Sequence, residues 1–564
     1  MKQKSKVVAN AIEAHGWVGL VISVPLFIVF WAGAITLFFP EVQRWAQMPH
    51  YPLTQQQQSS LSTTDVVNEK LAQLNYDYQR QMNVFFPGHR TPYMSLFVPV
   101  FDSDKDAQLA AQQRAKKADS TSDGINPNET STEAEPKPAS TEFKRLTIDP
   151  TTGKLLSDAN QFELASFLNH LHFTLELPQG LYIVGVITFF FLVIVFTGVV
   201  IQFKNIFRNF FLYRHKKTLR YKMNDLHNVV GVISLPFGSM YALTGVMFNL
   251  SILFQVATMF GLYQGDSTAM LKDAGLGGFQ SKPAHVAAPM PNLDQLIEQV
   301  EAESNIEVGR IRVLAWGDEN AMFQFSGVED GSFADRVSRV YSVASQDFPA
   351  DLNGADNNAF TDGVDLLFSM HMATFAGVDL RFVYFLLAMG FCAMIIAGNV
   401  LWIAKRQKKK NAYPKTIQVT RGLTLGACVA VIPATALGFL LERGLPLSLS
   451  ARGDWIHWSF GLVLLVGAIS AFFVRNNQRF IAYGCLSAAA LLLVLTTLDS
   501  LIFGPVIWSL WQQGYAEPAG VSFAIALVAA ILLVCGCWLL QQDRTNPAVA
   551  SQTVEAESAS TLSL

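Results

Sequence analysis

Long apolar runs alternate with polar segments along the chain, and their lengths define the first elements we predict. A helix that crosses the hydrocarbon core of a bilayer, about 30 Å thick, needs about twenty consecutive apolar residues. Eight runs meet this requirement, and each predicts a transmembrane helix. The runs lie at residues 17–39, 181–203, 228–250, 382–404, 419–440, 455–474, 481–504 and 520–540.

Two long polar segments separate the first four runs and show mixed helix and strand patterns. Residues 41–180 contain an amphipathic helical pattern at TTDVVNEKLAQL and strand patterns at YMSLFVPVF and FKRLTIDPTTGKLLS. Between these strands, residues 102–142 are too poor in apolar residues to form a core and predict a disordered linker. Residues 251–378 contain a helical pattern at NLDQLIEQVEAES followed by strand patterns. We expect each segment to form a small α+β domain.

The predicted organisation is a membrane all-α protein of eight spans with these two domains between them. In chain order it has an N-terminal segment with the first span (1–40), the first domain (41–180), two spans joined by a basic loop (181–250), the second domain (251–378), the fourth span (379–410), a four-span extension (411–541) and a disordered tail (542–564).

Composition and charge predict which side of the membrane each loop faces. Of the 564 residues 51% are hydrophobic, and the mean hydropathy is +0.28. Lysine and arginine concentrate before the first span and in the loops after the second, fourth and sixth spans. Short basic loops face the cytoplasm, so both termini are predicted to be cytoplasmic and both domains extracytoplasmic. The first run is too long for a signal peptide and predicts an uncleaved anchor. All five cysteines lie in predicted spans, which excludes a disulfide framework in the domains.

Histidine and glycine recur in an internal repeat of span, domain and span. His15 and Gly33 are eighteen residues apart, as are His227 and Gly245. Eighteen residues make five helical turns, so each histidine shares a helix face with its glycine, about 27 Å away along the axis. Both histidines lie at the predicted cytoplasmic boundary. We call them the inner pair.

A second pair of histidines lies at the opposite boundary. His172 precedes the second span and His371 the fourth; we call them the outer pair, with Gly33 and Gly245 at their level. Gly198 and Gly398 end the second and fourth spans at the level of the inner pair. This arrangement predicts a four-helix core with two imidazoles and two side-chain-free positions at each end.

Paired imidazoles in a helical bundle are typical of haem ligation, and glycine lets a porphyrin approach the backbone closely. Zinc is disfavoured, because no cysteine or carboxylate ligand clusters with either pair. The alternative is that the histidines are interfacial residues that only help packing. His170 is the weaker candidate beside His172, and Asp225 is expected to cap the third span or orient His227. His457, between Trp455 and Trp458, is expected to belong to the aromatic belt.

Several longer stretches resemble one known family, the PepSY-associated transmembrane family, also called iron-regulated membrane proteins. The stretches are AHGWVGLVISVPLFIVFWAGAITLF, RLTIDPTTGKLLSDANQFELASFLNHLHFTLELPQGLYIVGVITFFFLVIVFTGVV, NDLHNVVGVISLPFGSMYALTGVMF and LLFSMHMATFAGVDLRFVYFLLAMGFCAMIIAGNVLWIAKR, within about residues 10–410. The resemblance implies a protein of the bacterial inner membrane with periplasmic PepSY-like domains. It implies two b-type haems, one on the inner pair and one on the outer pair.

The resemblance also implies an activity, which is electron delivery to ferric siderophores in the periplasm to release Fe(II). The linker at 102–142 and the last four spans depart from the usual four-span form. We find no dinucleotide-binding or P-loop motif and expect no nucleic-acid partner, so electrons must come from a separate cytoplasmic reductase or from quinol. Two alternatives stay open: a haem-containing conduit to another periplasmic acceptor, and a non-enzymatic membrane protein whose domains bind a periplasmic protein.

Overall fold

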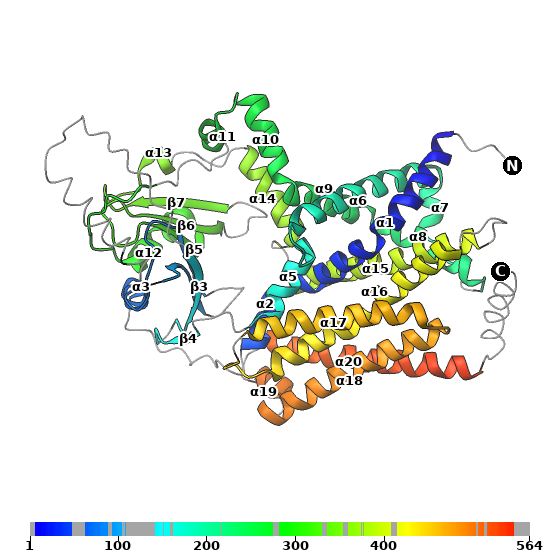
Figure 1. The fold of residues 1–564 in the computed structure, drawn as a ribbon. Helices are drawn as coiled ribbons and strands as arrows, with labels where there is room; N and C mark the ends of the chain where they lie inside the picture. The colour runs from blue at the N-terminus through cyan, green and yellow to red at the C-terminus, as the bar shows by residue number, and fades with distance from the viewer. Residues whose placement is uncertain are drawn as a thin grey trace. The chain divides into compact units, whose positions relative to one another are not determined.

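The chain forms two compact units in a computed structural model (Figure 1). A helical unit contains residues 1–49, 161–254 and 371–564, and a sheet unit contains residues 50–160 and 255–370. The structure describes residues 6–47, 62–87, 93–103, 108, 141–150, 152–157, 162–214, 216–273, 281–329, 336–353, 359–373, 375, 377–407, 414–449, 451–503, 506–512 and 516–545.

Seven helices within these described residues are long and apolar enough to cross a membrane, and a bent pair provides an eighth candidate. The seven are α1 (Lys6–Thr36), α6 (Gly180–Gln202), α15 (Val378–Arg406), α16 (Pro414–Gly444), α17 (Arg452–Phe473), α18 (Asn477–Phe503) and α20 (Ala516–Thr545). The pair, α8 (Leu219–Ile233) and α9 (Leu235–Asn249), is bent by 70°. The chain is therefore a multi-pass membrane protein, as its apolar runs predict.

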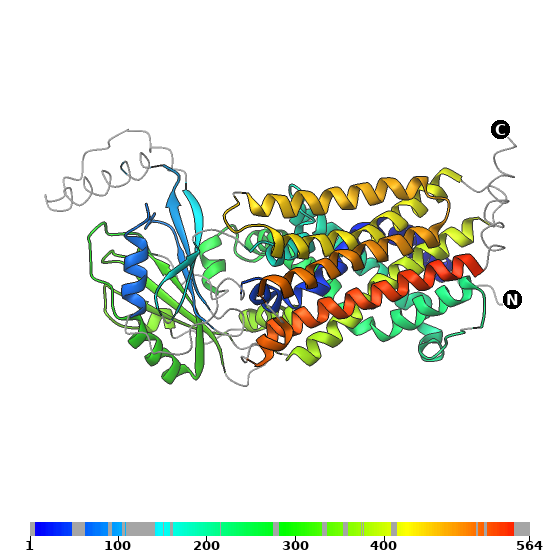
Figure 2. The same cartoon turned by 90° about the horizontal axis from the view of Figure 1, so that it is seen from below.

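The bend in the third candidate span has a local cause in the sequence. Pro236 lies in the first turn of α9, where proline cannot donate a backbone hydrogen bond, and the Ser234 hydroxyl donates to the Val230 carbonyl at 2.5 Å. Helix α1 begins and α20 ends at the same end of the helical unit (Figures 1 and 2). An even number of crossings is needed for this, so the bent pair counts as one span.

Two short helices that the hydropathy pattern does not separate precede α6 and α15. Helix α5 (Leu164–Thr174) ends where Leu175 and Glu176 adopt left-handed φ values of 53° and 54°, and α14 (Ala359–Met372) ends at Ala373 with φ 52°. These breaks explain why His172 and His371 stand 26 and 27 residues before their glycines without a common helical phase. The outer pair is thus carried by helices outside the long spans.

Apolar side chains from seven helices form the core of the helical unit. Helices α1, α5, α6, α15 and α16 supply most of it, and its largest members include Phe27, Phe30, Phe167, Phe191, Phe237, Phe391 and Phe460. The remaining helices are α2 (Phe39–Gln47), η1 (Phe203–Asn205), α7 (Ile206–Phe210) and α19 (Val506–Gln512). Helices α16, α17, α18 and α20 run side by side (Figure 2), and α16 and α17 of this bundle also contribute side chains to the core.

The strands of both polar segments join in one antiparallel sheet of order β4-β3-β2-β1-β5-β6-β7. Its strands are β1 (Met82–Phe85), β2 (Met94–Phe101), β3 (Thr141–Ile148), β4 (Leu155–Ser157), β5 (Ile306–Leu314), β6 (Met322–Glu329) and β7 (Arg336–Ser342). The prediction of two separate domains is therefore wrong. Strand β1, which the sequence patterns missed, pairs with β5 through Asn83 and Arg312 and joins the halves. Pairing covers an edge that each half would otherwise expose.

One helix from each half packs with the sheet. Helices α3 (Thr63–Leu71) and α12 (Leu293–Ser304) begin at Ser62 and Asn292, whose side chains accept backbone hydrogen bonds from the first turn. Their apolar sides join a single core with both halves of the sheet, including Val67, Leu96, Leu293, Ile311 and Phe323. The other helices of these segments are α10 (Ser251–Leu262), α11 (Ser267–Asp273) and α13 (Ala350–Asn353).

Some predictions fall on residues that the structure does not describe. They are nearly all of the linker 102–142, the tail beyond residue 545, and the positions of His50, His89 and His215, which the sequence predicts to be surface residues in loops.

Candidate cofactor-binding site

The four histidines singled out in the repeat meet as two pairs inside the helical unit. In the inner pair, the ring centroids of His15 on α1 and His227 on α8 are 6.0 Å apart. In the outer pair, the ring centroids of His172 on α5 and His371 on α14 are 6.1 Å apart. Segments far apart in the sequence therefore converge on two sites of nearly equal spacing.

Three of the imidazoles are anchored to backbone carbonyls of a neighbouring helix. The acceptors lie at 3.1 Å for His15 (Ile194), 3.0 Å for His227 (Met394) and 2.8 Å for His172 (Val29), each from the ring Nδ1. A carbonyl can only accept, so Nδ1 carries the proton in each ring and Nε2 keeps its lone pair. Metal-binding histidines typically have this arrangement, in which the nitrogen that does not bind the metal donates to a carbonyl.

The fourth imidazole uses a hydroxyl instead of a carbonyl. His371 Nδ1 lies 2.7 Å from the Thr244 hydroxyl oxygen, and that hydroxyl donates to the Met240 carbonyl at 2.8 Å. With its proton so engaged, the Thr244 oxygen accepts from Nδ1–H. The Tyr241 hydroxyl donates to the His371 carbonyl at 2.9 Å. Burial lowers the pKa of both outer imidazoles, that of His371 to about 3, with the nearby His172 as a second cause. Both rings are therefore neutral, the form that binds metals.

Three of the rings lie beside a glycine, and at one of these glycines a side chain would collide with the ring. A Cβ on Gly33 would lie 2.6 Å from His172 Nδ1, whereas one on Gly198 or Gly398 would lie 3.5 or 3.4 Å from Cε1 of His15 or His227. Each carbonyl acceptor lies four residues before its glycine, and at Gly33 the missing side chain lets the imidazole reach the acceptor. Gly245 differs, because its Cβ would meet Thr188 at 3.0 Å. The space expected for a porphyrin edge is thus filled by imidazole beside Gly33, Gly198 and Gly398.

Sequence reasoning missed the residue before each glycine. Thr244 binds His371, and the Thr197 hydroxyl lies 3.2 Å from His15 Nδ1. A signal was present, since the four glycines stand in WAG, FTG, LTG and IAG, where the preceding residue is always alanine or threonine. The hydroxyl partners themselves are not repeated, because Ala397 and Ala32 stand at the positions that correspond to Thr197 and Thr244.

The spacing of both pairs fits two axial ligands on one metal. A metal–imidazole nitrogen distance of about 2.0 Å, with about 1.2 Å more from the nitrogen to the ring centre, gives about 6.4 Å between the two centroids. The observed 6.0 and 6.1 Å agree with this value. The interplanar angles of 87° and 50° are compatible, because axial imidazoles can rotate about the metal–nitrogen bond. Among the described residues, no group of three or more His, Cys, Asp or Glu could hold a metal ion.

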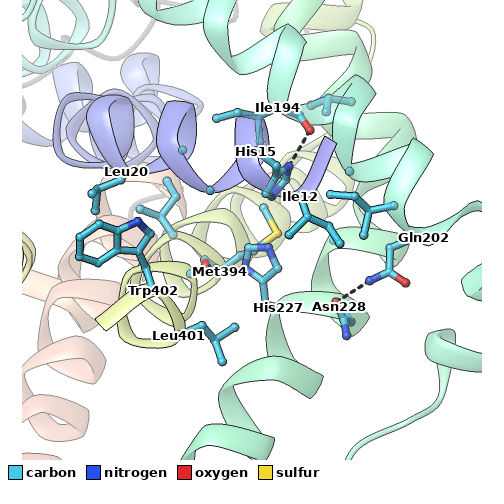
Figure 3. A pocket seen from close by; sticks show the side chains of 18 of the residues that line it. Ile12, His15, Leu20, Ile194, Gln202, His227, Asn228, Met394, Leu401 and Trp402 are labelled. Atoms are coloured by element: carbon cyan, nitrogen blue, oxygen red, sulfur yellow. Dashed lines mark hydrogen bonds between the residues drawn. The ribbon is translucent and has the colours of Figure 1, made fainter. Parts of the chain in front are cut away.

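A cavity of about 620 Å³ surrounds the inner pair (Figure 3), within the usual range for cofactor sites. His15 and His227 point toward one another in it. Trp402, Lys405 and Arg406 line the same cavity, and the buried Trp402 Nε1 has no hydrogen-bond partner within the described chain. The Arg406 guanidinium lies 3.7 Å from the centre of the Trp402 ring. The cavity thus combines apolar walls with donors suited to carboxylates.

Four buried phenylalanines separate the two pairs. Phe191 and Phe391 lie seven residues before Gly198 and Gly398, about two turns from the inner pair. The ring of Phe391 stacks on Phe30 at 4.6 Å and meets Phe191 at 5.7 Å and Phe237 at 6.1 Å. These four residues, which we call the phenylalanine cluster, fill the middle of the bundle.

The other candidates from the sequence lie away from the pairs or serve another purpose. Asp225 neither caps α8 nor orients His227, because the Arg214 guanidinium binds it at 2.8 Å. The His170 side chain is 59% exposed and lies 3.8 Å from Glu176. His457 stacks on Phe167 of α5 at 4.6 Å.

Comparison with known proteins agrees with this arrangement of spans. The chain matches the model of the PepSY-associated TM region over residues 12–405. It is similar to a Pseudomonas aeruginosa protein named "Uncharacterized protein PA4219", with 23% identity over 349 residues, which cover 60% of this chain and 84% of that protein. The family match includes both histidine pairs and all four glycines, and it ends before the last four spans. The chain belongs to the PepSY-associated transmembrane family.

Proposed function

We propose that this protein binds two b-type haems and carries electrons across the bacterial inner membrane. His15 and His227 would hold the inner haem, and His172 and His371 the outer one. The observation that carries the proposal is the spacing of the two pairs, 6.0 and 6.1 Å between ring centroids, with Nδ1 engaged and Nε2 left to bind.

The protein's own groups would hold, orient and shield the haems. Carbonyl and hydroxyl acceptors would fix the tautomer of every ligand ring, and the apolar walls would limit the access of water. At the inner site, the Trp402 N–H and the cations of Lys405 and Arg406 would bind the carboxylates of the macrocycle. Haem, when bound, supplies one-electron redox chemistry between Fe(III) and Fe(II).

The direction of transfer follows from the predicted sidedness. With both termini cytoplasmic, the inner pair would face a cytoplasmic reductase or a quinol, and the outer pair a periplasmic acceptor. We propose a ferric siderophore as that acceptor, on the strength of the family resemblance. One electron converts its Fe(III) to Fe(II), which hard oxygen ligands hold less tightly, and the iron is released.

Haem content tests the binding proposal. Purified protein should contain two haems per chain, removable with acid-acetone because the sequence has no CxxCH motif. Alanine at His15 or His227 should remove one haem, and alanine at His172 or His371 the other. His170→Ala, the exposed neighbour, is the matched control and should keep both. Wild-type protein without haem would overturn the proposal in favour of a packing role for the histidines.

Acceptor specificity is a separate question and needs its own assay. In dithionite-reduced protein freed of excess reductant, a ferric siderophore should reoxidise the haem spectrum and yield chelatable Fe(II). The iron-free siderophore should do neither. Haems that stay reduced across a panel of ferric siderophores would favour another periplasmic acceptor while leaving the binding sites intact.

A further inference from the structure

Helix α5, which carries His172, receives its N-terminal cap from another helix. The N-cap residue, Glu163, makes no side-chain capping hydrogen bond. Glu442 of α16 supplies it, since its Oε2 accepts the backbone N–H of Leu164 at 2.8 Å and that of Glu163 at 3.2 Å. The first N–H groups of a helix lack intrahelical partners, and a carboxylate there also interacts favourably with the helix dipole.

The same carboxylate is held by a buried arginine. Arg452 of α17 lies 3.0 Å from Glu442 Oε1 and also donates to the Glu442 backbone carbonyl. Glu442 is 2% exposed and Arg452 is 4% exposed. A buried ion pair adds little stability over apolar residues of similar volume, because removing both charges from water is costly. Stability alone therefore does not account for this pair.

Helices α16 and α17 also pack against side chains of α5. Phe167 stacks on His457 at 4.6 Å and meets Phe460 at 5.0 Å, both on α17. Leu164 packs where Gly438 of α16 has no side chain, since a Cβ there would lie 2.9 Å from it. His172 follows Leu164 by eight residues, about 12 Å along the axis.

We propose that Glu442 is a positioning residue for His172, and that α16 and α17 form a buttress that sets the orientation of α5. The inference rests on the proposed function for its link to haem. It gives a role to helices that lie beyond residue 405, where the family match ends. A carboxylate fixed by Arg452 sets the start of α5, and the helix transmits that position to the imidazole.

The test neutralises the pair without leaving a lone buried charge. In a His227→Ala background, which retains only the outer site, Glu442→Met with Arg452→Met removes the acceptor of the cap as well as both charges, and should weaken outer haem retention about tenfold, the lower limit typical of changes around a metal ligand. It should also shift the midpoint potential and the low-spin EPR signal. The control removes another ion pair, Arg479 with Asp543, which joins α18 to α20 away from α5, by Arg479→Gln with Asp543→Asn. The control should leave the outer haem unchanged.

A second measurement separates this inference from the haem proposal. Backbone amides of residues 164–174 should exchange hydrogen faster in the Glu442 double variant than in wild type or the control, with or without haem. If the wild-type protein binds no haem and the Glu442 double variant still exchanges faster than wild type, the buttress is supported and only the proposed function is overturned. Equal exchange in all three proteins, or an outer haem that responds alike to both double variants, would overturn the positioning role.

Discussion

Gly33→Ala adds one methyl group at the most crowded of the three positions where glycine faces an imidazole. The new Cβ would lie 2.6 Å from His172 Nδ1 and 2.7 Å from Cε1. Carbon contacts settle at about 3.5–4.0 Å, so the ring must retreat by about 1 Å. Its hydrogen bond to the Val29 carbonyl, now 2.8 Å, would stretch to about 3.8 Å and be lost.

The energetic consequence follows from burial. Leaving a buried polar group unsatisfied costs about 1–3 kcal/mol, which corresponds to roughly 5- to 150-fold in haem affinity at 1.4 kcal/mol per factor of ten. Glycine to alanine in an exposed helix interior would by itself stabilise by about 1 kcal/mol. A destabilising effect of Gly33→Ala would therefore be opposite in sign to the ordinary effect of this substitution.

The outcome is measured as the haem content per chain, by the pyridine haemochrome assay, and as the midpoint potentials, by a redox titration. Gly33→Ala should lose most of the outer haem and keep the inner one. Gly198→Ala, whose Cβ would stand at an ordinary 3.5 Å from His15, and Gly461→Ala, with nothing within 4 Å, should keep both. Full haem content and unchanged potentials in Gly33→Ala would refute the role we assign to the glycine.

Three further predictions concern single features. Thr244→Val removes the hydroxyl that accepts from His371 and should weaken outer haem retention about tenfold. Thr244→Ser keeps a hydroxyl and should bind the outer haem as wild type does. Equal haem retention in the two variants would contradict a role for the hydrogen bond. Trp402→Phe should lower inner haem retention measurably by extraction kinetics, and reconstitution with haem dimethyl ester should abolish the difference between variant and wild type. Replacing residues 103–139 by Asn-Gly should leave the sheet folded, as seen by circular dichroism and protease resistance, because Phe101 and Thr141 are direct antiparallel partners.

The spans and most strands were predictable because their signals are local. An apolar run of twenty residues or a period-two alternation is a property of one segment. Strand β1 was not predicted because it has only four residues, which are too few to show a clear period-two alternation. Its role is also non-local, since it joins the halves of the sheet by pairing with β5 more than two hundred residues later. No pattern within either segment indicates that partner.

The pairing of histidines was predictable from the repeat, but the details around them were not. Equal spacing of His15 to Gly33 and of His227 to Gly245 places the residues by level in the bundle. It does not show that imidazole, rather than porphyrin, occupies the space beside Gly33, because that depends on the separate helix α5 and its breaks. Haem binding itself stays a prediction. The contact between Glu442 and α5 involves a helix outside the repeat, α16, so the spacing within the repeat could not predict it.

The phenylalanine cluster has an electrical consequence under the proposed function. Its four rings neither donate nor accept hydrogen bonds, so they offer a proton no group to pass along, whereas electron transfer needs none. An electron that moves outward would then cross without a compensating proton. Such a movement runs from the negative to the positive side of an energised membrane, which is worth about 2.3 kcal/mol per 100 mV. The membrane potential would thus help drive reduction on the outer side, and collapsing it with an ionophore would slow turnover in vesicles.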